Sequence, residues 1–262
     1  MPHLWPVDPL VALSGLLVGL LVGQTGMGGG SLMTPILVLL FGVHPATAVG
    51  TDLLYASLTK TAGTLVHGLN GTVQWRIVRR LATGSVPATA ATLLLLAHVD
   101  LTGPRGNDVI SVTLGTMLVF TALSLLFRQQ FLNLVGPRLD RLSERRIAAL
   151  TVLVGTLLGV LVTISSVGAG AIGVTALVLL YPRTPMARIV GSDIAHAVPL
   201  TLVAGLGHWW IGSVNWPMLG GLITGSIPGI VIGSYLAVRV PEFVLRPILA
   251  ITLVVVGGRL VF

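Results

Sequence analysis

Ten apolar runs divide the chain, and they constrain its fold more than any other feature. Only 9% of its 262 residues are charged, against about 25% in soluble domains, which excludes a soluble globular protein and a disordered chain. A helix needs about 20 residues to cross a bilayer, with about 17 as the lower limit. The sequence therefore predicts an all-α polytopic membrane protein of about 8–10 helical segments. The runs lie at about 9–24, 30–42, 46–67, 81–98, 108–127, 147–164, 170–182, 189–207, 218–238 and 243–261. Two of them, 30–42 and 170–182, are too short to cross, which favours half-helices or re-entrant hairpins.

The remaining composition narrows the class further. No Lys or Arg precedes the first apolar run, so we expect no signal peptide and an N-terminus outside the cell. Cysteine is absent, which rules out disulfides and thiolate metal sites. The net charge of +7 on so apolar a chain indicates membrane orientation and not nucleic-acid binding.

The two halves of the chain repeat one another. At an offset of 141 residues, Gly50-Thr51-Asp52 aligns with Gly191-Ser192-Asp193, and His67 aligns with His208. The turn and the Trp that follow each histidine also align, as do Thr83–Pro87 and Thr224–Pro228. Upstream, glycines and a proline align at an offset of 140. We infer an internal duplication with a first membrane repeat at 1–127, an Arg-rich linker at 128–146 and a second repeat at 147–262.

The placement of basic residues predicts how the repeats are oriented. If each short Gly-rich segment returns to the side from which it came, 12 of the 15 basic residues lie on one face. If each segment is instead one broken span, nine arginines lie on one face and five on the other, with Lys60 left out of both counts. Because positive residues gather on the cytoplasmic side, the first arrangement is favoured, and it gives repeats of inverted topology. We expect a multi-pass protein of a bacterial or archaeal cell (inner) membrane, with the 128–146 linker cytoplasmic and the two termini on opposite faces.

Two Gly-rich turns are candidates for binding an anion. Helix N-termini present unpaired N–H groups and a partial positive charge, and Ser31 is a plausible N-cap for the helix that follows the first turn. If both turns lie near the midplane, two helix N-termini face one site. The alternative is close helix packing through small residues. The candidate residues of the two turns are Thr25, Gly28, Gly29, Gly30, Ser31, Ser165, Ser166, Gly168 and Gly170.

Two aspartates occupy equivalent positions in the repeats. A carboxylate within a membrane span is costly and is a functional candidate by default, here as a proton carrier for Asp52 and Asp193. The alternative is a helix N-cap near the interface, since both follow Gly-Thr or Gly-Ser at the start of an apolar run. Thr51 and Ser192 share that alternative and are equally candidates for binding the ligand.

Lys60 is the only lysine, and it falls in the middle of an apolar run. An ammonium at that depth needs a carboxylate or an anionic substrate as its partner, unless it reaches an interface. The other repeat has Thr201 at this position, so the duplication is broken where the charge is. Three histidines are candidate proton relays: His67 and His208 at the ends of equivalent helices, and His196 three residues after Asp193. For the first two, a structural role is the alternative.

These motifs together resemble one family of membrane proteins. They are Gly26-Met27-Gly28-Gly29-Gly30 with Pro35 behind it, Ala48-Val-Gly-Thr51, and His67 followed by Gly71-Thr-Val, with echoes at Gly191-Ser192 and Gly212-Ser-Val. Over about residues 11–261 the chain resembles the TauE/SafE membrane transporters, also called sulfite exporters. The resemblance implies about eight spans and movement of sulfite, sulfonates, sulfoacetate or other small organic anions across bacterial inner membranes.

We therefore expect a secondary transporter, and no enzyme, that moves a small organic or sulfur-containing anion. The Gly-rich turn at 25–31 lacks the Lys-Ser/Thr of a P-loop, so an ion gradient is the expected energy source and no cofactor is expected. No metal is expected, because the six histidines are scattered at no ligand spacing. The expected partners are the anion and the lipid bilayer, not nucleic acid, and a homodimer is left open. Two alternatives remain, a passive anion channel and an intramembrane hydrolase with the two aspartates as a dyad.

Overall fold

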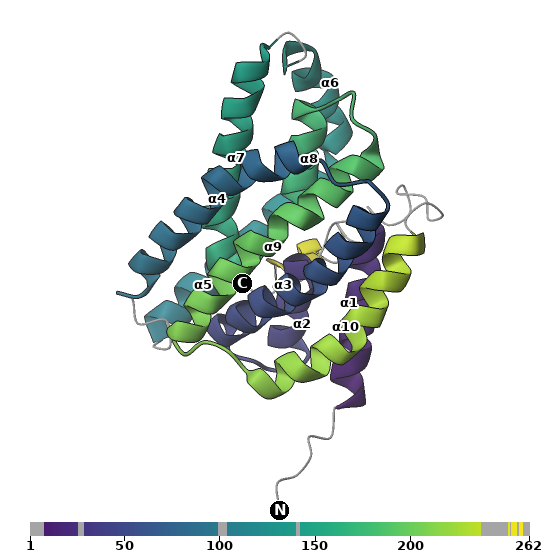
Figure 1. Cartoon of the computed structure of the whole chain (residues 1–262). Helices are drawn as coiled ribbons and strands as arrows, with labels where there is room; N and C mark the ends of the chain where they lie inside the picture. The colour runs from purple at the N-terminus through teal and green to yellow at the C-terminus, as the bar shows by residue number, and fades with distance from the viewer. Residues whose placement is uncertain are drawn as a thin grey trace, which may run out of the picture.

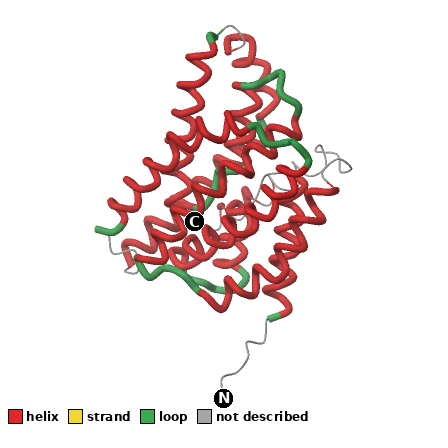
Figure 2. The backbone as a smooth tube through the Cα atoms, viewed as in Figure 1, coloured by secondary structure: helices red, strands yellow, loops and turns green. Residues whose placement is uncertain are grey.

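The computed structural model describes residues 8–25, 29–98, 104–139 and 142–236, with a few residues between 251 and 258. Within these residues every regular element is an α-helix (Figures 1 and 2). The prediction of an all-α protein is confirmed. The helices are α1 (Pro9–Thr25), α2 (Gly29–Leu39), α3 (Pro45–Leu69), α4 (Trp75–Leu96), α5 (Pro104–Leu126), α6 (Arg128–Leu139), α7 (Glu144–Ser165), α8 (Ala171–Leu180), α9 (Met186–Trp210) and α10 (Trp216–Leu236).

The helices follow the predicted apolar runs with two differences. The 128–146 linker contains a helix, α6, where we expected a polar stretch. The last run, 243–261, lies almost entirely outside the described residues. By length and composition, α7, α9 and α10 can each cross a membrane, and the bent pair α5–α6 brings the described spans to as many as four. The short segments expected as half-helices are α2 and α8, with 11 and 10 residues.

Six helices pack side by side in the order α1, α10, α3, α9, α4, α7. In this row α1 of the first repeat packs most extensively against α10 of the second, and α7 of the second packs against α4 of the first. The helices α3 and α9 meet in the middle of the molecule, where they run alongside each other in Figure 1. Neither half of the sequence therefore forms a unit of its own, because each outer pair takes one helix from each repeat.

Glycines bring these helices into backbone contact. A Cβ on Gly19 of α1 would lie 2.5 Å from the carbonyl oxygen of Ser226 on α10. The equivalent glycine of α7, Gly159, faces the carbonyl oxygen of Ser85 on α4 at the same 2.5 Å. Small residues allow such close approach, which in membranes takes the place of the hydrophobic effect between helices.

Equivalent helices of the two repeats run in opposite directions. Gly50, near the start of α3, lies against Ser213 beyond the end of α9, and Gly191, near the start of α9, lies against Thr72 beyond the end of α3. Thus α3 and α9 are antiparallel. In the other neighbouring pairs of the row, residue numbers rise together along the contact, as in Gly15 against Leu222 followed by Gly19 against Ser226. Thus α1 and α10 are parallel to α3, whereas α4 and α7 are parallel to α9.

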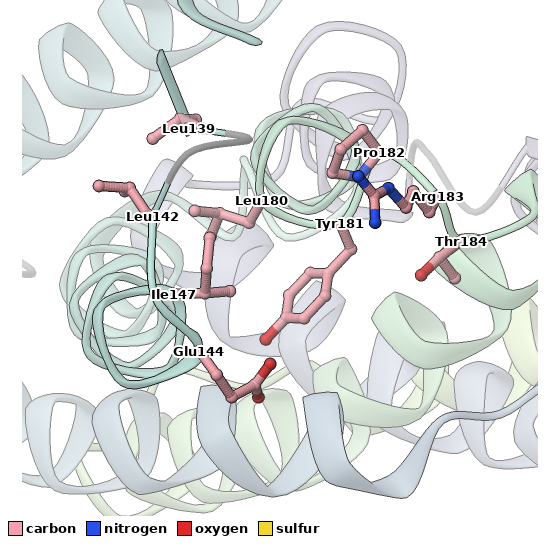
Figure 3. A pocket seen from close by; sticks show the side chains of 9 residues that line it. All are labelled: Leu139, Leu142, Glu144, Ile147, Leu180, Tyr181, Pro182, Arg183 and Thr184. Atoms are coloured by element: carbon pink, nitrogen blue, oxygen red, sulfur yellow. The ribbon is translucent and has the colours of Figure 1, made fainter. Parts of the chain in front are cut away.

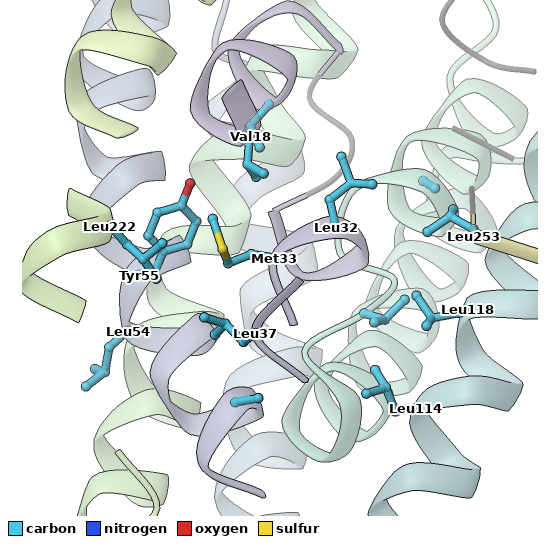
Figure 4. Packing of buried hydrophobic residues seen from close by; sticks show 14 of the residues in the cluster. Val18, Leu32, Met33, Leu37, Leu54, Tyr55, Leu114, Leu118, Leu222 and Leu253 are labelled. Atoms are coloured by element: carbon cyan, nitrogen blue, oxygen red, sulfur yellow. The ribbon is translucent and has the colours of Figure 1, made fainter. Parts of the chain in front are cut away.

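The interior and the outer surface differ from those of a soluble protein. One apolar cluster, shown in Figure 4, packs α2 and α3 against α1, α5 and α10 around Tyr55, Met33 and Leu37. The buried interior also contains Asp52, Asp193, Lys60 and other polar residues. The outer face, in contrast, exposes many large apolar side chains, among them Leu65, Leu95, Leu153, Leu157 and Leu206. A lipid-facing surface accounts for this pattern.

Candidate functional site

Asp52 and Asp193 lie inside helices and not at helix caps. Each is the eighth residue of its helix, α3 or α9, and both are fully buried. The N-cap alternative is wrong because the helices begin earlier, with Pro45 in the first turn of α3 and Pro185 as the N-cap of α9. Proline is favoured at a helix start, where its missing N–H costs no hydrogen bond.

The Asp52 carboxylate is held by hydroxyls from both repeats. Its Oδ2 accepts hydrogen bonds from Thr34 Oγ1 of α2 at 2.5 Å and from Ser166 Oγ of the α7–α8 turn at 2.9 Å. Its Oδ1 is buried and has no hydrogen-bond partner among the described residues. Bonds to a charged acceptor are worth about 1.5–3 kcal/mol each, so Asp52 ties α3 to α2 and to the opposite repeat.

The Asp193 carboxylate, in contrast, has no hydrogen bond to a described residue. Both of its oxygens are buried and unpartnered in the described part of the chain. It lies against the backbone of α8, since a Cβ added to Gly173 would overlap Asp193 Oδ1. A buried carboxylate in this state is costly unless a nearby charge or a proton compensates it.

The nearby charge is Lys60, which is 2% exposed in the middle of α3. Its ammonium interacts electrostatically first with Asp193 and then with Asp52. Neither described carboxylate comes within the 4.0 Å of an ion pair, because the only salt bridges of the described residues join Glu144 to Arg76 and Arg80. Lys60 therefore does not reach an interface, and it faces two carboxylates at a distance.

His196 completes this cluster from α9. Its Nε2 lies 2.9 Å from Ser85 Oγ of α4, and its Nδ1 is buried without a partner. Lys60 acts on His196 as well, so the lysine influences three buried ionisable groups. The equivalent of His196 in the first repeat is Tyr55, whose hydroxyl donates to the carbonyl of Gly15 at 3.3 Å.

Thr51 and Ser192 make reciprocal contacts between the repeats. Thr51 Oγ1 accepts from the backbone N–H of Asn215 at 2.9 Å, just before α10. Ser192 Oγ accepts from the N–H of Gln74 at 2.9 Å, just before α4. Both hydroxyls thus satisfy the start of a helix in the other repeat. Their role as ligand-binding groups stays a prediction.

His67 and His208 are buried at the ends of α3 and α9. His67 Nδ1 lies 2.9 Å from Thr72 Oγ1, and His208 Nε2 lies 2.9 Å from the carbonyl oxygen of Thr163. The other ring nitrogen of each is buried without a partner. Along α3, His67 follows Lys60 by seven residues, and along α9, His208 follows His196 by twelve. The role of both histidines as proton relays stays a prediction.

The Gly-rich turns are described only in part. Gly28 lies outside the described residues, and the structure gives only the backbone of Thr25, Gly29 and Gly30, at the end of α1 and the start of α2. Ser31 is not the N-cap of α2, because the helix already begins at Gly29.

The second turn is fully described. Ser166 adopts a left-handed conformation with φ of 57° at the end of α7, and Gly168 has φ of 110°. Ser165 Oγ accepts from the N–H of Val167 at 3.2 Å, and Gly170 is the N-cap residue of α8. Of this turn, Ser166 is the residue whose side chain donates to Asp52.

A second polar cluster lies at one end of the bundle, where α4, α7 and α8 meet. Arg80 donates to Glu144 Oε1 at 2.5 Å and to the Tyr181 hydroxyl at 3.1 Å, and Arg76 also pairs with Glu144 at 3.0 Å. Beside it is a cavity of about 240 Å³, into which Tyr181 and Glu144 point from facing walls (Figure 3). This end carries the linker that we expect to be cytoplasmic.

Comparison with known proteins identifies the family. The profile described as "Sulfite exporter TauE/SafE" matches residues 11–260. The chain belongs to the TauE/SafE family. This TauE/SafE protein is 37% identical to the probable membrane transporter protein YjnA of Bacillus subtilis, over 96% of this chain and 98% of the relative. It is 24% identical to the probable membrane transporter protein YdhB of the same species, over 97% and 100%. No solved structure matches it significantly.

Three residues of the candidate site were missing from the sequence prediction. Thr34 holds Asp52, Ser85 holds His196, and Gly173 makes room for Asp193. Ser85 carried a signal, because it lies in the repeated segment Thr83–Pro87. Thr34 and Gly173 carried none, since small and hydroxyl residues are common in any membrane helix.

Proposed function

We propose that this protein is a secondary transporter that moves a small sulfur-containing or carboxylate anion across the cell membrane, with export as the expected direction. Membership of the TauE/SafE family gives the transporter class. One observation carries the anionic substrate: Lys60 is buried in the middle of α3 without an ion pair to a described carboxylate. A buried ammonium is retained where an anion binds it.

The same proposal extends to the mechanism. Antiparallel equivalent helices with swapped packing support inverted-topology repeats, and such repeats alternate access by rocking around a fixed site. The site would lie between α3 and α9, with Lys60 for the anion, and Ser166 and the Gly-rich turns as further ligands. An ion gradient, most simply of protons, would be coupled through the buried aspartates and histidines.

Replacement of Lys60 tests the proposal. We expect Lys60→Ala to abolish uptake of radiolabelled sulfite, or of a simple carboxylate, into proteoliposomes. The fold should persist, which a monodisperse profile in size-exclusion chromatography would report. Thr201→Ala is the matched control, because Thr201 is the repeat equivalent of Lys60, is equally buried and should leave most uptake intact. Unchanged uptake by folded Lys60→Ala would contradict an anion site at Lys60.

The same vesicles distinguish a transporter from a passive channel. A transporter gives uptake that saturates, responds to a pH gradient and shows counterflow of the labelled anion. A channel gives flux that follows only the electrochemical gradient of the anion. Absence of counterflow would favour the channel.

A further inference from the structure

The two repeat-equivalent aspartates have different surroundings. Asp52 has two hydroxyl donors on one oxygen, from Thr34 and Ser166. Asp193 has none on either oxygen in the described part of the chain. The two aspartates therefore differ in hydrogen bonding, although both occupy the eighth position of equivalent helices.

The surroundings of Asp193 allow it to gain and lose a proton. The charged group that acts on it is Lys60 from α3, which also acts on Asp52 of the same helix and on His196, three residues after Asp193. The packed helix α8 carries no ionisable side chain, and α4 contributes Ser85, while its Arg76 and Arg80 bind Glu144 at the outer end. When Asp193 is ionised its charge acts on Lys60, and when it takes a proton it loses no hydrogen bond to a described residue.

Asp52 is suited to the opposite role. Protonation of Asp52 would weaken two hydrogen bonds that connect α3 to α2 and to the α7–α8 turn. Lys60 also acts on Asp52, and the Tyr55 hydroxyl of the same helix lies in the apolar cluster. The surroundings of Asp52 therefore favour one fixed state.

From this difference we infer that Asp193 is the carboxylate that exchanges a proton during transport, whereas Asp52 is a positioning residue held by Thr34 and Ser166. The inference rests on the proposed transport function and deepens it. A proton bound at Asp193 removes a counter-ion of Lys60, and the substrate anion takes its place. A proton and an anion are then bound in the same state of the carrier, and the charge of the site is unchanged. With this coupling, export proceeds where the outward gradient of the anion exceeds the inward gradient of protons.

Transport assays with Asp193→Asn and Asp52→Asn test the inference. In Asp193→Asn we expect uptake of radiolabelled sulfite driven by a pH gradient to fall at least about tenfold, whereas counterflow persists because a neutral side chain leaves Lys60 available. In Asp52→Asn we expect a lower maximal rate with the same pH dependence as the wild type, because the amide oxygen still accepts from Thr34 and Ser166. The reverse pattern, or equal loss of pH dependence in both variants, would overturn the inference.

The positioning role has its own matched pair. Thr34→Val removes a donor to Asp52, whereas Thr175→Val removes a buried hydroxyl of α8 that donates only to the Ala171 carbonyl. We expect Thr34→Val to lower the maximal rate several-fold more than Thr175→Val, without a change in pH profile, and Thr34→Ser to restore it. A shifted pH profile in Thr34→Val would show that Asp52 itself exchanges the proton.

A measurement without substrate separates this inference from the proposed function. In infrared difference spectra recorded across a pH change, the carboxylic acid C=O band should vanish in Asp193→Asn and persist in Asp52→Asn. If the wild type moves no sulfite or carboxylate but this pattern holds, the proposed function fails and the assignment of the exchanging carboxylate stands. A band that vanishes only in Asp52→Asn refutes the assignment.

Discussion

The two repeats share their packing and differ in their chemistry. Gly19 against Ser226 and Gly159 against Ser85 are the same contact made twice, as are the hydroxyl contacts of Thr51 and Ser192. The buried ionisable residues are not repeated in this way, because Lys60 aligns with Thr201 and Tyr55 aligns with His196. Duplication thus preserved the framework that brings the halves together, while the centre of the molecule diverged.

The largest effect should come from the shared framework. A Cβ at Gly225 would overlap the carbonyl of Ala12 on α1, and one at its equivalent Gly84 would overlap the carbonyl of Val152 on α7. Because backbone cannot yield as a side chain can, we expect Gly225→Val and Gly84→Val each to cost at least about 3 kcal/mol. Thermal unfolding in detergent measures this, with Gly68→Val as a control in open space. A large loss in only one variant would break the equivalence of the two helix pairs.

A smaller effect is expected at the polar cluster of Arg76, Arg80, Glu144 and Tyr181. The first two align with Pro217 and Gly221, so the opposite end of the molecule has no equivalent ion pairs. We expect Glu144→Gln to loosen the contact between α4 and α7 and to increase access to the adjacent cavity.

The absence of cysteine makes this prediction simple to measure. In a Thr184→Cys background, labelling by a membrane-impermeant maleimide should rise several-fold on Glu144→Gln, because Thr184 lines the cavity. Arg145→Gln is the control, since Arg145 is exposed and makes no described ion pair. Equal labelling in both variants would show that the cluster does not restrict access.

The smallest effect should come from the reciprocal hydroxyl contacts. Thr51→Val and Ser192→Ala each leave one helix-start N–H without its partner, for a cost of about 1–2 kcal/mol. Because the geometry is the same at both places, the two losses of stability should agree. A much greater loss of transport than of stability in either variant would instead support a role for that hydroxyl in ligand binding.

Much of the fold could be predicted from apolar runs and internal repetition. The predicted runs at 46–67 and 189–207 begin within three residues of α3 and α9, but the Gly-Thr-Asp and Gly-Ser-Asp motifs resembled helix caps, so the N-cap alternative stayed open for two aspartates that lie in the second turn or beyond. The candidate site was predicted through its charges, since any buried charge in an apolar run is conspicuous. Its hydroxyl and glycine partners, Thr34, Ser85 and Gly173, could not be recognised, because such residues also serve simple packing.

The sequence by itself determined that this protein is a duplicated helical membrane protein, and that Lys60, Asp52 and Asp193 are its unusual charges. Those properties depend on composition and spacing along one chain. Only the tertiary structure decided that each repeat completes the helix pairs of the other, and that Asp52 is held by hydroxyls whereas Asp193 is not. The physical reason is that hydrogen bonds and desolvation depend on which helices meet, and α3 meets α9 from the other half of the chain.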